Sequence, residues 1–220
     1  AGTAFFALQS VNASSNGAGG IAIGEAAART AGTGDAIGWF QAIDASANGG
    51  AGIALGSGVA AMTGNAQLLM ENVTASSNAM GILDPTAGGI VILGHAAEAM
   101  TGTVEATFSA VTASFNGGPG IAIGGNGAVA VEGDAILTMN GIFALSNGAA
   151  DGLTNAHGIA IGTNGAQVAA SGDAVAYFEM LTANGNGGSG LNIGGNGAQT
   201  ENGDAELGLG GIIACSNSAS

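Results

Sequence analysis

The sequence predicts an all-β fold made of about thirteen short, mostly antiparallel strands in Gly/Ala-rich two-strand repeats of about 32 residues. Three observations predict it. Two glycine-initiated modules alternate along the chain, apolar residues recur with period two inside the modules, and short connections rich in Asn and Gly separate them. Because the modules run from end to end, we expect residues 1–220 to form a single repetitive β domain.

The first module is a short apolar strand flanked by glycines, and the six copies differ by only a few letters. They begin at Gly20 (GIAIG), Gly52 (GIALG), Gly89 (GIVILG), Gly120 (GIAIG), Gly158 (GIAIG) and Gly190 (GLNIG). Alanine favours helices, but the density of glycine and the absence of a 3.6-residue apolar stripe argue against one. The module is therefore expected to be a strand.

The second module has fixed internal spacing in each of its seven copies. A branched aliphatic residue follows the first glycine at the ninth position, alanine at the eleventh and asparagine at the fourteenth. The copies begin at Gly2, Gly34, Gly64, Gly102, Gly133, Gly172 and Gly203. Such spacing indicates that every copy occupies an equivalent place in the structure.

A large apolar residue stands at the sixth position of every second module. Stacked in register on one sheet face, these residues would form a ladder of bulky side chains through a surface of Ala and Gly. Period-two alternation in "GDAVAYFEML" places Ala176, Phe178 and Met180 on one side of a half-buried strand. The ladder residues are Leu8, Phe40, Met70, Phe108, Met139, Phe178 and Leu209.

The connections favour hairpins between antiparallel neighbours. Most contain two to five residues rich in Asn and Gly, such as the turns at Thr-Gly-Asp and "NGGPG". Two longer connections, after Asn78 and Asn147, carry Asp84, Pro85, Asp151 and His157, and we expect them either to protrude or to mark where the sheet folds over. A β-solenoid with two arms per coil is the alternative, and it requires arches that join different sheets.

The charge balance limits the partners. The formal net charge is −14 and Arg29 is the only basic residue, so the clustered Lys and Arg that nucleic acid binding needs are absent. Divalent cations are the more plausible small partners. No apolar run reaches the ~18 residues of a membrane helix, and the small residues at the start of the chain fit the mature end of a secreted protein.

The sequence assigns no catalytic, cofactor-binding or metal-binding residue, so we expect no enzyme. An aspartate recurs at one turn, at Asp35, Asp134, Asp173 and Asp204, and these carboxylates could line up as a row that binds cations. One carboxylate per turn falls short of a calcium ligand set, and the preference of Gly-Asp for turns explains the recurrence. His95 and His157 are interpreted as surface loop residues. The Gly-rich stretch "GGNGAVA" lacks the lysine of a phosphate-binding loop.

Three further residues are candidates for modification. Cys215 is the only cysteine, so it is either a small buried side chain in register with Ser114 or the site of an intermolecular disulfide. Asn12 and Asn72 lie in formal glycosylation sequons, and both fall inside expected strands. Occupancy of these two sites is left open by the sequence.

The first and last arms are both full copies of the second module, with no lysine to protect an edge. We therefore expect the sheet to continue into further copies of the chain, edge to edge. In a strictly alternating array of thirteen arms, such a head-to-tail junction would pair parallel strands.

Gly/Ala-rich arms, the pattern "GIAIG…GDA…ASxNG" and the acidic balance resemble the amyloid-like major sheath proteins of filamentous methanogenic archaea. The resemblance implies a structural protein that self-assembles into an extracellular sheath or cell-envelope layer. The alternative is a secreted β-solenoid binding module, such as an adhesin or an ice-binding protein.

Overall fold

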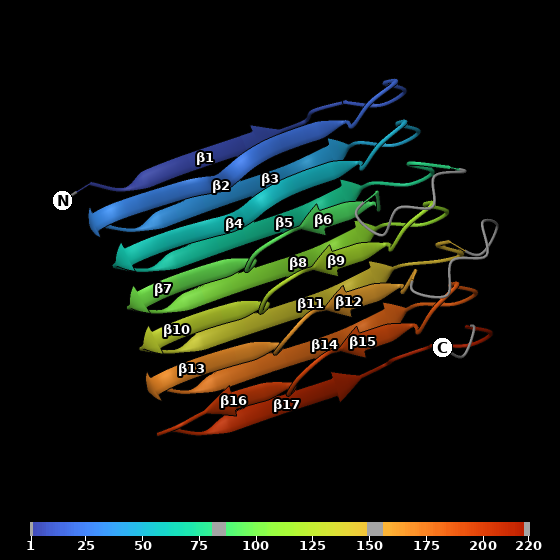
Figure 1. Cartoon of the computed structure of the whole chain (residues 1–220). Coiled ribbons are helices and arrows are strands. Elements are labelled where there is room, and N and C mark those ends of the chain that lie inside the picture. Colours follow the sequence, from blue (N-terminus) through green and yellow to red (C-terminus); the bar gives the residue numbers. More distant parts are fainter. Residues whose placement is uncertain (1, 81–86, 149–155, 218–220) are drawn as a thin grey trace.

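The computed structural model describes residues 2–80, 87–148 and 156–217. Every element in these ranges is a strand, and the strands form two sheets that run the length of the stack (Figure 1). The two long connections, with Asp84, Pro85 and Asp151, lie mostly outside the described residues. No helix in the described ranges is long and apolar enough to cross a membrane.

The seven-stranded sheet, sheet A, has the order β1-β3-β5-β8-β11-β14-β17, and the ten-stranded sheet, sheet B, holds the remaining strands. Sheet A consists of β1 (Ala4–Gln9), β3 (Ala36–Asp44), β5 (Ala66–Thr74), β8 (Val104–Thr112), β11 (Ala135–Phe143), β14 (Ala174–Thr182) and β17 (Ala205–Gly210). Sheet B consists of β2 (Ile21–Thr33), β4 (Ile53–Thr63), β6 (Ile90–Ile92), β7 (Ala97–Thr101), β9 (Ile121–Ile123), β10 (Ala128–Glu132), β12 (Ile159–Ile161), β13 (Ala166–Ser171), β15 (Leu191–Ile193) and β16 (Ala198–Thr200).

The prediction of mostly antiparallel strands is wrong, because every strand pair in the described residues is parallel. Each second module forms one strand of sheet A, and each first module with its tail forms one layer of sheet B. The short Asn/Gly connections are therefore arches that carry the chain from one sheet to the other, and equivalent residues meet in successive coils. This arrangement is that of a β-solenoid.

The core lies between the two sheets and is built from ladders of equivalent residues. The expected ladder at the sixth position is present: Phe40 pairs with Met70, and Met70 with Phe108. All three side chains are fully buried, facing the isoleucines and leucines of sheet B. The ladder shares the bulk of the core with the branched residues at the ninth position, such as Ile43, and with the isoleucines of the first module, such as Ile121.

A kink that recurs in every strand of sheet A changes which side chains face the core. The residue at the eighth position of each module has a positive φ, for example Ala42 (φ 53°) and Met180 (φ 50°). Since strand side chains alternate, this extra left-handed residue lets the sixth and ninth positions both point inward, as Phe40 and Ile43 do. The prediction that Met180 shares the face of Phe178 is therefore wrong, and Met180 is exposed.

The glycine that opens each first module lies where a side chain has no room. A Cβ on Gly120 would lie 2.6 Å from the carbonyl oxygens of both Ala113 and Gly158 and 2.7 Å from Nδ2 of Asn147. All three contacts belong to the arch that brings the chain from sheet A to sheet B. The GIAIG glycine is thus required by the close approach of the backbone, rather than by a turn conformation.

We expect Gly120→Ala to destabilise the fold by about 2 kcal/mol or more, because the carbonyl of Ala113 in its own coil and that of Gly158 in the next coil would have to move. Gly24→Ala is the matched control, since a Cβ there meets no atom within 4 Å; the control is expected to be within about 0.5 kcal/mol of the parent. Denaturant unfolding followed by circular dichroism measures both. Equal stability of the two variants would contradict the assignment.

Candidate functional site

One asparagine per coil forms a continuous ladder through the arch between the sheets. In each coil, both the backbone N–H and the side-chain Nδ2 donate to Oδ1 of the asparagine in the next coil, as Asn78 does to Asn116 at 3.0 and 3.1 Å. The same pair of bonds recurs in every step of the ladder, which consists of Asn16, Asn48, Asn78, Asn116, Asn147, Asn186 and Asn217. The five central amides are buried, so each depends on its neighbours for satisfaction.

The asparagine ladder has a direction. Because donors always point toward the following coil, no donor among the described residues reaches Oδ1 of Asn16, while Nδ2 of Asn217 turns back to the carbonyl of Ala183 at 2.8 Å. The first asparagine therefore presents an acceptor and the last a backbone donor. The two ends of the described stack are complementary to each other in hydrogen bonding.

The strand edges at the two ends of the described stack are open. Within these residues β1 pairs only with β3, and β17 pairs only with β14. Leu207 and Leu209 continue the inward-facing columns of Ala176 and Phe178, yet they are 47% and 59% exposed. Among the described strands of sheet B only β16 contacts β17, whereas inner strands of sheet A contact two, as β14 contacts β13 and β16, so these leucines are covered from one side alone.

A second amide ladder runs through sheet B where the Gly-rich stretches interrupt its strands, and two of its asparagines, Asn126 and Asn164, are buried. The backbone N–H of Asn164 donates to Oδ1 of Asn126, and that of Asn196 to Oδ1 of Asn164. His95 occupies the equivalent place in an earlier coil, and its Nδ1 accepts the N–H of Asn126 at 2.9 Å. The Gly-rich stretches, which lack the lysine of a phosphate-binding loop, thus connect successive coils, and His95 belongs to this second ladder.

His157 also bridges two coils. Its Nδ1 accepts the backbone N–H of Ser189 at 2.9 Å, which requires an unprotonated nitrogen at that position. Partial burial lowers the pKa of His157 below its usual value of 6.5. The surface-loop interpretation of both histidines therefore misses their role as acceptors between coils.

The repeated aspartates lie along the exposed turn from sheet B to sheet A. The carboxylate of Asp134 accepts the N–H of Asp173 at 3.0 Å, and that of Asp173 accepts the N–H of Asp204 at 2.9 Å. Asp35 accepts the N–H of Asn65 in the same way. These bonds account for the recurrence of an acceptor at this turn, and the described residues contain no group of three or more His, Cys, Asp or Glu arranged to hold a metal ion.

The candidates for modification are all at the surface. Cys215 is exposed, which overturns the expectation of a small buried side chain, and its N–H donates to Oδ1 of Asn184. Asn72 is exposed at the kink of β5, with φ 53°, and the exposed Asn12 accepts the N–H of Ser14. Both sequon asparagines are thus accessible in a single chain.

The acidic residues are distributed unevenly over the two outer faces. Sheet A presents Glu71, Glu105, Glu179 and Glu206 outward. These carboxylates affect Tyr177: a hydrogen bond with Glu206 raises the pKa of Tyr177 most, and desolvation and the charges of Glu206 and Glu179 raise it further. In the described residues of sheet B, away from its turns, the outward carboxylates are Glu25 and Glu98. Sheet B also carries Arg29, so its outer face is close to neutral.

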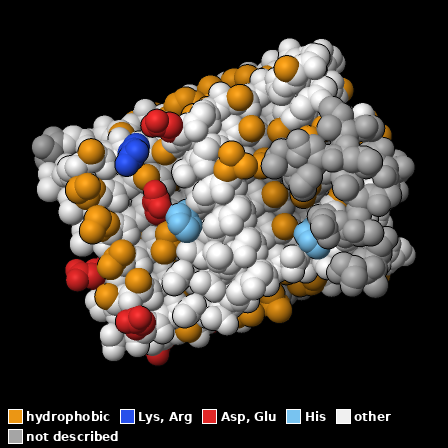
Figure 2. All heavy atoms as spheres, in the orientation of Figure 1, with side chains coloured by type: hydrophobic (Ala, Val, Ile, Leu, Met, Phe, Trp, Pro, Cys, Tyr) orange, Lys and Arg blue, Asp and Glu red, His pale blue; other side chains and the backbone are white. Residues whose placement is uncertain are grey.

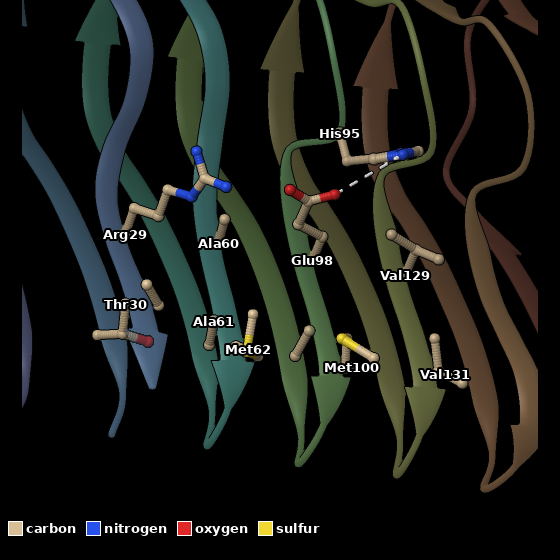
Figure 3. A pocket seen from close by; sticks show the side chains of 12 residues that line it. Arg29, Thr30, Ala60, Ala61, Met62, His95, Glu98, Met100, Val129 and Val131 are labelled. Carbon is tan, nitrogen blue, oxygen red and sulfur yellow. Dashed lines mark ion pairs between the residues drawn. The ribbon is translucent and has the colours of Figure 1, made fainter. Parts of the chain in front are cut away.

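A shallow groove of about 330 Å³ crosses this outer face of sheet B (Figure 3). Arg29 on β2 and Glu98 on β7 project into it on either side of Ala60 on β4, and Glu98 Oε2 lies 3.9 Å from His95 Nε2. Apolar side chains line the part of the groove nearer the strand ends: Ala31, Met62, Met100 and Val131. Figure 2 shows this face, with its single basic side chain among hydrophobic ones.

Comparisons with protein-family models, with curated proteins and with solved structures find no match for this chain. The functional interpretation therefore depends on the geometry alone.

We expect Asn116→Ala to destabilise the fold by about 3 kcal/mol, because two buried donors of Asn78 lose their acceptor and Asn147 loses two donors. Asn140→Ala, which removes an exposed bond to Glu179 on sheet A, is the control and should cost less than about 0.5 kcal/mol. Denaturant unfolding measures the difference. A loss below about 1 kcal/mol for Asn116→Ala would show that the ladder adds little.

The lowered pKa of His157 predicts a loss of stability in mild acid. Because the folded chain holds the proton less tightly than the unfolded chain, this contribution is complete above pH 6.5 and declines as the pH falls from 6.5 toward the folded-state pKa. His157→Asn keeps an acceptor for Ser189 but does not titrate. The slope of unfolding free energy between pH 7.5 and about 5 should therefore be shallower in this variant, and an unchanged slope would contradict the prediction.

Proposed function

We propose that this chain is a structural protein whose coils stack edge to edge, between copies, into an extracellular β-sheet layer such as a sheath or cell-envelope wall. The observation that carries the proposal is the asparagine ladder, which repeats one donor-acceptor pattern in every coil and presents opposite halves of it at the two ends of the described stack. Its partners are copies of the same chain.

The direction of the ladder favours head-to-tail stacking. In that arrangement the backbone N–H of Asn217 would meet Oδ1 of Asn16 in the next copy, whereas head-to-head or tail-to-tail contacts would oppose two acceptors or two donors. The junction would be parallel, like every other strand pair, so the exception expected for an alternating array does not arise.

Sheet A supplies the second support. Pairing of β1 from one copy with β17 of another would continue the alanine and large apolar ladders, since both strands begin at the same position of the second module. This junction leaves one position of sheet B to be filled by a further strand, opposite Leu207 and Leu209. Covering those leucines would supply a hydrophobic contribution to assembly.

The secreted binding module remains a second candidate because of one observation on sheet A. Trp39, Leu69 and Tyr177 lie in a single outward column of sheet A, and their side chains are suited to stacking against a ligand ring. The same column contains Thr107 and Thr138. A row of only two threonines disfavours ice binding. Electron microscopy separates the candidates: filaments or sheets support the structural role, and a monodisperse particle supports the binding module.

The free edge of β17 provides the sharper test. Ala174 N–H donates to the carbonyl of Asp204, so by strand alternation the main-chain groups of Leu207 face away from β14. Leu207→Pro removes an outward donor and leaves the bonds to β14, and we expect the yield of filaments to fall at least about tenfold. Leu207→Ala, which keeps the donor, is the matched control.

Circular dichroism should show that both variants of Leu207 retain the β fold. Filaments of unchanged yield from Leu207→Pro would mean that β17 is not an assembly edge, and the proposal would then fail at this junction.

A further inference from the structure

The outer face of sheet B has a charge pattern that is complementary to itself. Arg29, Ala60 and Glu98 lie side by side in one row across β2, β4 and β7, because Arg29 pairs with Ala60 and Ala60 with Glu98. At about 4.8 Å between strands, the two opposite charges are about 10 Å apart, with a small residue midway. No ion pair within 4 Å joins Arg29 to a carboxylate of the described residues.

We propose that this face binds a second copy of the chain, face to face, about a two-fold axis that follows β4 through Ala60. The operation exchanges the positions of β2 and β7, so Arg29 of each copy lies opposite Glu98 of the other. The strands of both copies then run in the same direction, and the two stacks ascend in opposite directions. This contact is lateral, and it does not depend on the pairing of strand edges.

Steric complementarity supports the same axis. The neighbouring row across the face consists of Ala31, Met62, Met100 and Val131, of which Met62 and Met100 are 47% and 54% exposed. The operation places Met62 against Met62 on the axis and the large Met100 against the small Ala31. Flexible methionines at such a contact bury apolar area without demanding a single fit.

The distribution of charge favours this face over the others. Sheet A and the turn beside it carry most of the carboxylates of a chain with net charge −14, so contact through either would bring like charges together. On sheet B the operation sets Glu25, which lines an adjoining hollow with Arg29 and Glu98, toward the end of the face where His95 lies. Away from the turns, the two outward carboxylates of this face, Glu25 and Glu98, thus each lie toward a nitrogen-bearing side chain instead of another carboxylate.

A two-fold contact of this kind predicts an exchange experiment that an interaction inside one chain does not. In a dimer of Arg29→Glu, two pairs of glutamates would face each other across the contact, and in a dimer of Glu98→Arg, two pairs of arginines would do so. Each variant alone should therefore dimerise at least tenfold more weakly. An equimolar mixture of the two should pair again, because every position 29 then faces the opposite charge at position 98. The double variant R29E/E98R should pair with itself.

Pairing is measured with Met62→Cys in a Cys215→Ser background and a short bis-maleimide cross-linker, which joins the two thiols on the axis into a covalent dimer. Thr138→Cys on the outer face of sheet A should give no such product, and Glu105→Arg on that face should leave the Met62→Cys product unchanged. The expected result is loss of the dimer in each single charge variant and its return in the mixture. Absence of the dimer in the parent, or no return in the mixture, would overturn the proposal.

The Leu207→Pro substitution separates this contact from edge assembly. In that background the lateral dimer should persist while filaments are lost. If the lateral contact is wrong and edge assembly is right, the charge variants still form filaments with unchanged yield and no cross-linked product.

Discussion

The hydrogen bonds between equivalent residues of successive coils are the constraint on which the rest of the structure depends. A buried asparagine amide is satisfied only when the next coil places its own asparagine one strand spacing away. That requirement fixes parallel strands in register, and register in turn stacks phenylalanine and methionine in one column and aspartate in another. It also explains the opening glycine of GIAIG, since a side chain there would collide with the amide that the ladder holds in place.

The repeat, the strand content and the bulky ladder could be predicted from the sequence, but strand direction was predicted wrongly. Short Asn/Gly connections suit both hairpins and arches, so loop length does not distinguish them. Two signals did carry the answer: a ladder at the sixth position requires equivalent modules to be neighbours, and inward residues at the sixth and ninth positions require a kink. Both are features of stacked coils.

The candidate sites were harder to foresee because they arise between coils. Nothing near Arg29 in the chain points to Glu98, which follows 69 residues later and meets it only through the register of β2, β4 and β7. In the sequence His95 has the features of a loop histidine, and only the stacking of coils shows that it lies in one column with Asn126. The aspartates were correctly assigned to a turn. Each carboxylate also accepts a backbone N–H of the next coil, which explains further why an acceptor recurs at this position.

The orientation of the main-chain hydrogen bonds makes the described stack mechanically anisotropic. Every bond between coils points along the stack, so a load in that direction is shared by a whole row of bonds at each interface, and one interface must yield as a unit. A load across the sheets meets only apolar contacts and side chains. A wall built from such units would be stiff along one axis and would delaminate along another, as a fibrous composite does.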